Sequence, residues 1–296
     1  MYVITGATGN TGSKIAQALL KAGKEVKVIS RKAENVENLV KSGAKSAIGS
    51  LEDTDFLTQA LEGATAVYAM LPPNFTAPDF RAYQNTIDKS LAQAIKNAGV
   101  KHAISLSSVG AHLGNGAGVV DGVADLEKYL NEIPDLNVVH LRPTFFMENF
   151  YGNIGLIKQA GIAGFSAKGN LKIPMIATKD IAEVAVKLFL DLNFTGQSIQ
   201  YILGAKDYTF DEATAILGKA IGKENLPYVS FPYEDAEKAM VEQMGASLSL
   251  AKAYSQFFKS LNDGKITEDV KRDSKNTSPT TLEAFAKEFA VVYQNS

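Results

Sequence analysis

Short apolar runs alternate with amphipathic stretches along the first half of the chain. The apolar runs predict strands at Tyr2–Thr5, Val26–Ile29, Ser46–Ile48, Ala66–Leu71, His102–Val109 and Asn137–Leu141. Apolar residues at helical spacing predict intervening helices at Ser13–Ala22, Phe56–Leu61 and about Pro78–Ala98, and another around Leu126 and Leu130. Strands joined by helical crossovers form a parallel sheet covered on both faces. The pattern therefore predicts an α/β fold, a Rossmann-type doubly wound parallel sheet that binds ligands at the carboxyl ends of its strands.

The rhythm changes beyond about Phe145. Aromatic residues cluster there, and a glycine-rich stretch follows at Gly161–Gly169. Thr209 and Glu212 form a capping-box pattern ahead of an apolar helix at Ala213–Ile221, and the remaining residues are mostly helical and amphipathic. We expect a nucleotide-binding domain at 1–145, on which residues 175–193 pack back, and a smaller, mostly helical substrate-side lobe at 146–296.

A glycine loop follows the first predicted strand and opens the first predicted helix. Gly6, Gly9 and Gly12 have the spacing of a dinucleotide-binding fingerprint within a βαβ unit. Glycines permit the tight turn, and the positive end of the helix binds the pyrophosphate. Thr8, Asn10 and Thr11 add side chains that can donate hydrogen bonds. The alternative is a turn that only packs helix on strand, but the position and flanking elements favour dinucleotide binding.

Two cations stand where the second strand ends. NAD-specific folds usually place an acidic residue there, about 20 residues past the loop, to bind the ribose hydroxyls. This chain has Arg31 and Lys32 instead. A guanidinium can bind a 2′-phosphate with two hydrogen bonds or stack on adenine, so we expect NADP(H) to be preferred over NAD(H). Ordinary surface charges are the alternative.

Charge and composition argue against several other classes of protein. The 30 basic residues are balanced by 32 acidic ones and form no block, so we expect no nucleic-acid partner. The chain has no cysteine, which excludes disulfides, thiolate metal ligands and cysteine nucleophiles, and no metal-binding spacing occurs. No secretory signal or membrane-spanning run is present. We expect a cytoplasmic protein without a membrane partner; its oligomeric state has no sequence signature.

At the level of motifs, the chain resembles the NmrA-like family of atypical short-chain dehydrogenases/reductases, which includes a quinone oxidoreductase. The segments that carry the resemblance are Ile4–Gly12, Ser107–Ser108, Leu141–Thr144 with the following Phe-Phe-Met-Glu-Asn, Thr178–Ala182 and Ser278–Leu282. The resemblance spans most of the chain, and the N-terminal motif is its most specific part. It implies cofactor contacts by the glycine loop, Arg31, Leu71, Pro72, Ser107, Pro143 and Thr144.

The chain departs from the wider superfamily at its acid–base pair. Ordinary members use Tyr-x-x-x-Lys, in which the lysine lowers the tyrosine pKa for proton transfer to a substrate oxygen. None of the 11 tyrosines here has a lysine four residues on. Val119 and Val123 stand where relatives place the pair, and Val123 also excludes a lysine acting alone. Alcohol–ketone chemistry is therefore not expected.

Quinone reduction fits this absence. A reduced quinone leaves an aromatic hydroquinone anion, which is far less basic than an alkoxide and can be protonated by solvent. Hydride transfer to it mainly needs the acceptor held against the nicotinamide in a dry apolar slot. The residues that could form or serve this slot are Phe145, Phe146, Asn149, Phe150, Tyr151 and His112.

Each of these residues also has a structural interpretation. Aromatic residues at this spacing are more often core residues, and Asn149 could cap a turn. His112 follows the fifth strand and could donate to a quinone oxygen, whereas His102 and His140 lie in or beside strands and are interpreted as structural. No catalytic residue is identified.

Two functions remain open from the sequence. The first is an NADPH-dependent oxidoreductase acting on a quinone or similar small electrophile such as an azo dye. The second is a non-catalytic NADP(H) sensor that controls a protein partner, as eponymous members of the family are thought to do. A reductase for plant-type phenylpropanoids is disfavoured by the missing lysine. An open apolar pocket over the nicotinamide would distinguish the enzyme from a sensor with a large interaction surface.

Overall fold

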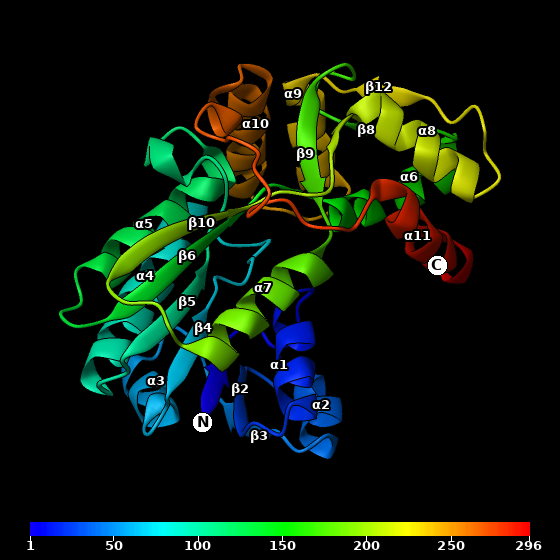
Figure 1. The fold of residues 1–296 in the computed structure, drawn as a ribbon. Helices are drawn as coiled ribbons and strands as arrows, with labels where there is room; N and C mark the ends of the chain where they lie inside the picture. Colours follow the sequence, from blue (N-terminus) through cyan, green and yellow to red (C-terminus); the bar gives the residue numbers. More distant parts are fainter.

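Seven strands pair in parallel in the order β10-β6-β5-β4-β1-β2-β3. The computed structural model describes all residues, Met1–Ser296. The strands are β1 (Tyr2–Ile4), β2 (Val26–Ser30), β3 (Lys45–Ile48), β4 (Ala66–Ala69), β5 (His102–Leu106), β6 (Asn137–Pro143) and β10 (Gln197–Ile202). Helices cross over between them, so the carboxyl ends of all seven strands share one edge (Figure 1). The predicted doubly wound parallel sheet is confirmed.

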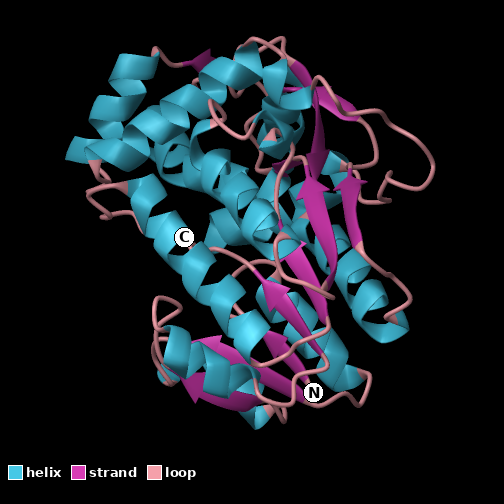
Figure 2. Ribbon diagram, turned by 90° about the vertical axis from the view of Figure 1, so that its left-hand side faces the viewer, coloured by secondary structure: helices cyan, strands magenta, loops and turns pink.

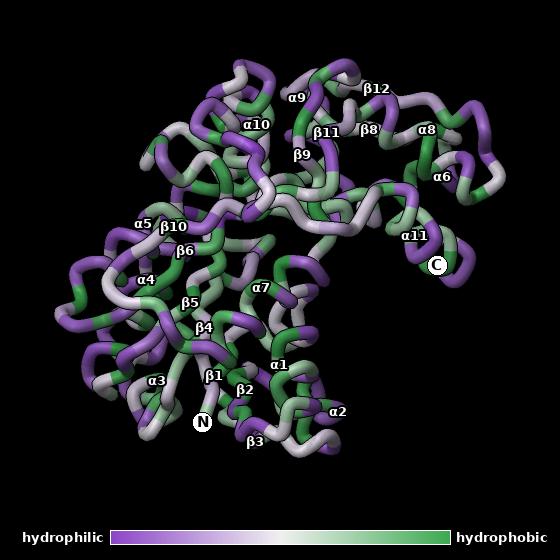
Figure 3. The backbone as a smooth tube through the Cα atoms, in the orientation of Figure 1, coloured by the Kyte–Doolittle hydropathy of each residue, from purple (hydrophilic) through white to green (hydrophobic).

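The sheet is buried on both faces because its strands are apolar at successive positions. Tyr2 and Ile4 enter one core, whereas Val3 between them enters the other. The first core is closed by α1 (Gly12–Lys21), α2 (Glu37–Lys41) and α7 (Thr178–Asp191). The second is closed by α3 (Thr54–Leu61), α4 (Phe80–Asn97) and α5 (Asp121–Asn131). Hydrophobic stretches of α1 and α7 lie together beside the sheet (Figure 3).

The strand β10 was not predicted from the sequence. It pairs with β6 at the edge of the sheet, and its first three residues are exposed. An edge strand of this kind needs no apolar run, so the criterion that found the other strands did not detect it. The expected strands at Ala66–Leu71 and His102–Val109 end earlier, at Ala69 and Leu106, while β6 continues to Pro143.

Short strands and helices form the smaller lobe beyond the carboxyl edge (Figure 2). Its strands are β7 (Phe145–Phe146), β8 (Ala163–Phe165), β9 (Lys172–Ile176), β11 (Asp207–Thr209) and β12 (Tyr228–Ser230). Its helices are α6 (Ile154–Ala160), α8 (Phe210–Ala220), α9 (Tyr233–Glu242), α10 (Leu248–Asn262) and α11 (Leu282–Asn295). The predicted capping box is present, since Thr209 and Glu212 exchange both hydrogen bonds at the start of α8. The division at residue 145 remains a prediction, and β10 adds a later segment to the sheet.

None of the helices is both long and apolar enough to cross a membrane.

Candidate functional site

The glycine loop joins β1 to α1, and two of its glycines are sterically required. Gly6 has a φ of 60°, and a Cβ built on it would lie 2.1 Å from Met70 Sδ. A Cβ on Gly12 would lie 2.3 Å from the Gly6 carbonyl oxygen. A Cβ on Gly9 would approach only that same oxygen, at 3.3 Å. Gly6 and Gly12 therefore shape the turn, whereas Gly9 leaves its outer side free for the close approach of a ligand.

The N-terminus of α1 is free to receive an anion. No side chain caps the helix, and its first turn contains no acidic residue. Thr11 is buried, and its hydroxyl accepts a hydrogen bond from the buried Tyr68 at 3.1 Å. Thr8 and Asn10 are exposed on the outer side of the loop. Lys14 Nζ donates to the Asn10 carbonyl at 2.8 Å and to Thr178 Oγ1 at 3.2 Å, which ties the loop to α7.

Arg31 and Lys32 are both exposed at the carboxyl end of β2. Lys32 pairs weakly with Glu34 at 3.8 Å, and Arg31 takes part in no ion pair. Burial raises the pKa of Tyr83 on α4, and the charge of Arg31 opposes that rise. Arg31 is thus the cation that is free to meet a phosphate.

The other expected cofactor contacts lie at the carboxyl ends of β4, β5 and β6. Leu71 and Pro72 are half-buried just beyond β4. Ser107 is buried after β5, and its hydroxyl donates to Glu127 on α5. Pro143 ends β6, and the buried Thr144 hydroxyl that follows has no hydrogen-bond partner. An unpartnered buried hydroxyl is uncommon in a folded protein and is consistent with a ligand contact.

The place of the missing acid–base pair is apolar. Val119 and Val123 are half-buried, and both pack against the core of the smaller lobe. Neither can move a proton. Val119 and Val123, here called the valine wall, therefore contribute no acid or base on the α5 side of the sheet edge.

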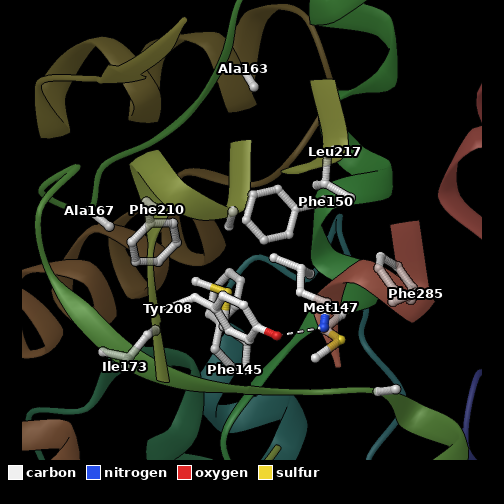
Figure 4. Close-up of a cluster of buried hydrophobic side chains, with 14 of the residues drawn as sticks. Phe145, Met147, Phe150, Ala163, Ala167, Ile173, Tyr208, Phe210, Leu217 and Phe285 are labelled. Carbon is white, nitrogen blue, oxygen red and sulfur yellow. Dashed lines mark hydrogen bonds between the residues drawn. The ribbon is translucent and has the colours of Figure 1, made fainter. Parts of the chain in front are cut away.

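The aromatic candidates mostly belong to the core of the smaller lobe. Phe145 and Phe150 meet edge to face at 6.1 Å, near Phe210 (Figure 4). Both rings also contact Phe165. Phe150 is only 1% exposed, which favours the core role that the sequence left open. Contact of either ring with a substrate remains a prediction.

The neighbouring candidates are more accessible. Phe146 is half-buried and packs against the sheet core. Tyr151 stacks on Phe289 of α11 at 5.9 Å, and burial raises its pKa to about 12, so this phenol is not an activated acid. Asn149 is exposed. None of the three has a geometry that assigns it a chemical role.

His112 lies between two carboxylates and is hydrogen-bonded to one of them, Glu268. Its Nε2 lies 3.2 Å from Glu268 Oε1, and its Nδ1 lies 3.1 Å from Asp269 Oδ2. The ring is therefore engaged by the segment between α10 and α11. Its Nδ1 makes no hydrogen bond, and its predicted donation to an acceptor oxygen remains a prediction.

A match to the model of the NmrA-like family covers residues 2–286. The chain belongs to the NmrA-like family. An NAD(P)H azoreductase of Xenophilus azovorans is 28% identical over 87% of this chain and 86% of the relative. Quinone oxidoreductase 2 of Escherichia coli is 26% identical over 95% of each chain. The crystal structure of a Citrobacter sp. triphenylmethane reductase complexed with NADP(H) superposes with a TM-score of 0.81 at 19% identity, covering 98% and 100% of the two chains.

Family membership and these relatives support a general oxidoreductase role. The superposition confirms the Rossmann-type fold.

The segments that carry the NmrA-like resemblance meet in space. Glu148, in the segment after β6, accepts hydrogen bonds from the backbone and hydroxyl of Thr178. Asp180 accepts from the backbone and hydroxyl of Thr280, at 3.1 and 2.6 Å. The late motif thus anchors the C-terminal segment to the start of α7, and these contacts were not foreseen from the sequence.

A buried ion pair beneath Ser107 was also missed. Arg142 contacts Glu127 with Nε at 2.9 Å and Nη2 at 2.6 Å, and both side chains are less than one-tenth exposed. Burial lowers the pKa of Arg142, but the hydrogen bonds from Arg142 to Glu127 outweigh this effect, so the pKa of Arg142 is raised. The signal was present, because Arg142 is the one Arg, Lys, Asp or Glu residue in the buried strand β6.

Proposed function

We propose that the protein is an NADPH-dependent oxidoreductase that transfers a hydride to a quinone or a similar electrophile, without a Tyr-x-x-x-Lys pair. One observation carries this proposal. The glycine loop with its uncapped helix end follows β1, and Val119 and Val123, which stand in place of the acid–base pair, follow β5, so both lie at the carboxyl edge of the same parallel sheet. Such a site suits a dinucleotide and an acceptor whose reduction needs no protein acid.

Different residues at the carboxyl edge would bind different parts of the cofactor. The loop Gly6–Gly12 and the start of α1 would hold the pyrophosphate. Arg31, with Lys32 beside it, would bind the 2′-phosphate, which supports NADP(H) over NAD(H). The nicotinamide half would lie along Leu71, Pro72, Ser107, Pro143 and Thr144.

When bound, NADPH supplies a hydride, that is, two electrons and one proton, from its dihydronicotinamide ring. An acceptor quinone becomes a hydroquinone anion, and solvent supplies the remaining proton. The chain's own residues hold the two rings together and exclude water through the valine wall. Tyr151 keeps its proton, because its pKa is raised to about 12. The smaller lobe at 146–296 would supply the acceptor's contacts.

The named relatives support this assignment. They include an azoreductase and a quinone oxidoreductase, each aligned with most of this chain. Both names describe reduction of conjugated acceptors. The chemistry of the valine wall and the names of the relatives therefore point to the same class of acceptor.

Steady-state oxidation of NADPH and NADH by the purified protein, with and without a small panel of quinones and azo dyes, tests the proposal. We expect acceptor-dependent oxidation with NADPH favoured, and no activity on simple ketones. Gly12→Ala is the matched variant that should lose turnover and binding together. Tight NADP(H) binding with no turnover on any acceptor would reject the enzyme and favour an NADP(H) sensor acting through a protein partner.

A further inference from the structure

The segment 263–281, here called the strap, joins α10 to α11 across the carboxyl edge of the sheet. It runs beside the ends of β6 and β10, in orange to red in Figure 1. Leu203, just past β10, donates to the Asn276 carbonyl at 2.7 Å, and Ser278 donates to the Leu203 carbonyl at 2.8 Å. With Thr280 bound to Asp180, the far half of the strap is fixed to the sheet and to α7.

The near half of the strap docks on the loop after β5. Ile266 is fully buried, and a Cβ built on Gly110 would lie 2.8 Å from Ile266 Cδ1. Gly110 has a φ of 86°, so glycine is needed there both for backbone conformation and for this contact. Glu268 is hydrogen-bonded to His112 of the same loop, and Asp269 lies beside the ring. The strap therefore contacts this loop at an apolar point and at a polar one.

The contacts of Asp269 also extend inward, toward the carboxyl edge of the sheet where the cofactor is proposed to bind. Its carboxylate accepts from the Tyr201 hydroxyl, and Arg142 Nη1 bonds to Tyr201 at 2.9 Å and lies 3.8 Å from Asp269. Arg142 in turn is paired with Glu127, which accepts the Ser107 hydroxyl. A continuous polar chain thus joins Asp269 in the strap to Ser107 at the end of β5.

Burial makes this chain sensitive to each of its members. The side chains of Arg142 and Glu127 are 7% and 9% exposed, so neither can replace a lost partner with bulk water. Hydrogen bonds in such surroundings polarise one another, and removal of one member changes the geometry of the next. The Ser107 hydroxyl has a single proton and donates it to Glu127. The orientation of this hydroxyl therefore follows the position of the Glu127 carboxylate.

We propose that Asp269 is a positioning residue for the cofactor site, although it lies outside the sheet. It sets the orientation of Ser107 through Tyr201, Arg142 and Glu127. The strap therefore contributes to cofactor affinity without touching the cofactor. This inference rests on the proposed placement of the nicotinamide beside Ser107.

A double-mutant cycle on NADPH affinity tests it. The variants are Asp269→Asn, Ser107→Ala and their combination, with Asp263→Asn as the matched control. Asp263 lies in the same strap, is about half exposed and has only a 4.0 Å contact with Lys265. The dissociation constant of NADPH, measured by fluorescence titration, is the readout, and thermal unfolding confirms that each variant is folded.

We expect each single variant to weaken NADPH binding about 5- to 10-fold, and the double variant to be no weaker than about twice the worse single. Asp263→Asn should stay within about twofold of the wild type. Unchanged affinity in Asp269→Asn or in Ser107→Ala, or effects that multiply in the double variant, would overturn the proposal. If Asp269→Asn does not fold, Tyr201→Phe with Ser107→Ala gives a second cycle with the same expectation, because the Tyr201 hydroxyl joins Asp269 to Arg142. Binding is independent of turnover, so a wild type that reduces no acceptor would reject the proposed reaction while leaving this cycle interpretable.

Discussion

In the sheet, Val3 enters one core while its neighbours Tyr2 and Ile4 enter the other. In the smaller lobe, the core is assembled from rings that are far apart in the sequence, among them Phe150, Phe210 and Phe285. The first arrangement is local, because a strand buried on both faces shows a continuous apolar run. The second arrangement depends on tertiary contacts between short elements. Such contacts leave no comparable pattern of apolar residues in the sequence.

The same difference applies to the proposed cofactor contacts and to the proposed acceptor contacts. The glycine loop is defined by contacts within a few residues, such as Gly12 against the Gly6 carbonyl. The features on the other side of the site come from distant segments, such as Val119 packed on the lobe core and His112 beside Glu268 and Asp269. We infer that cofactor recognition is built into the sheet half and that the lobe determines which acceptor is reduced.

Substituting a loop glycine should give the largest effect. Gly12→Ala places a Cβ 2.3 Å from the Gly6 carbonyl oxygen, so the loop must open and NADPH affinity should fall by about 100-fold or more. Gly155→Ala in α6 is the matched control, because nothing lies within 4 Å of its Cβ. It should keep affinity and stabilise the protein by about 0.5–1 kcal/mol. Isothermal titration with NADPH measures the affinities, and thermal unfolding measures the stabilities. Equal NADPH affinities in Gly12→Ala and Gly155→Ala would contradict the assignment of cofactor binding to the glycine loop.

Truncating a ring in the lobe core should affect stability rather than binding. Phe150→Ala removes a ring that is 1% exposed and should lower the free energy of unfolding by about 3–5 kcal/mol. Phe75→Ala, at a side chain 43% exposed, should cost less than about 1 kcal/mol. Denaturant unfolding measures both. A large loss of NADPH affinity in folded Phe150→Ala would show that the two halves are not separable in this way.

A buried carboxyl in the sheet half should give a smaller, pH-dependent effect. Burial, together with the charge of Asp125, raises the pKa of Asp88 to about 8, and neither carboxyl oxygen has a hydrogen-bond partner. The folded state keeps a proton that the unfolded chain loses near pH 3.8, so this contribution to stability is lost as pH rises from about 4 to about 8.

Asp88→Asn should therefore gain stability relative to the wild type over that range, by at least about 1.4 kcal/mol, the equivalent of one pKa unit. Denaturant unfolding at several pH values measures the difference, and the exposed Asp235→Asn is the control. A difference that does not change with pH would contradict the assignment.

Features of the molecule could be predicted from the sequence when their contacts join residues that are close together in the chain. The strands β1 to β6 and the loop Gly6–Gly12 were predictable because apolar runs and glycine spacing are local signals. Strand β10 was not, because an exposed edge strand needs no apolar period. The chain from Ser107 to Asp269 spans five segments, and only Arg142, a charge within a buried strand, gave any sign of it. Whether His112 or the aromatic residues contact a substrate depends on packing that no local pattern encodes.

The dissociation constants of NADPH and NADH for the wild type, Arg31→Glu and Lys32→Glu test the central claim most directly. If the sheet half recognises the 2′-phosphate through Arg31, Arg31→Glu should weaken NADPH about 10- to 100-fold and change NADH by less than about threefold. Lys32→Glu should have a smaller effect in the same direction, because Lys32 already faces Glu34. Equal losses for both cofactors, or no loss for either, would contradict the placement of the cofactor on this edge of the sheet.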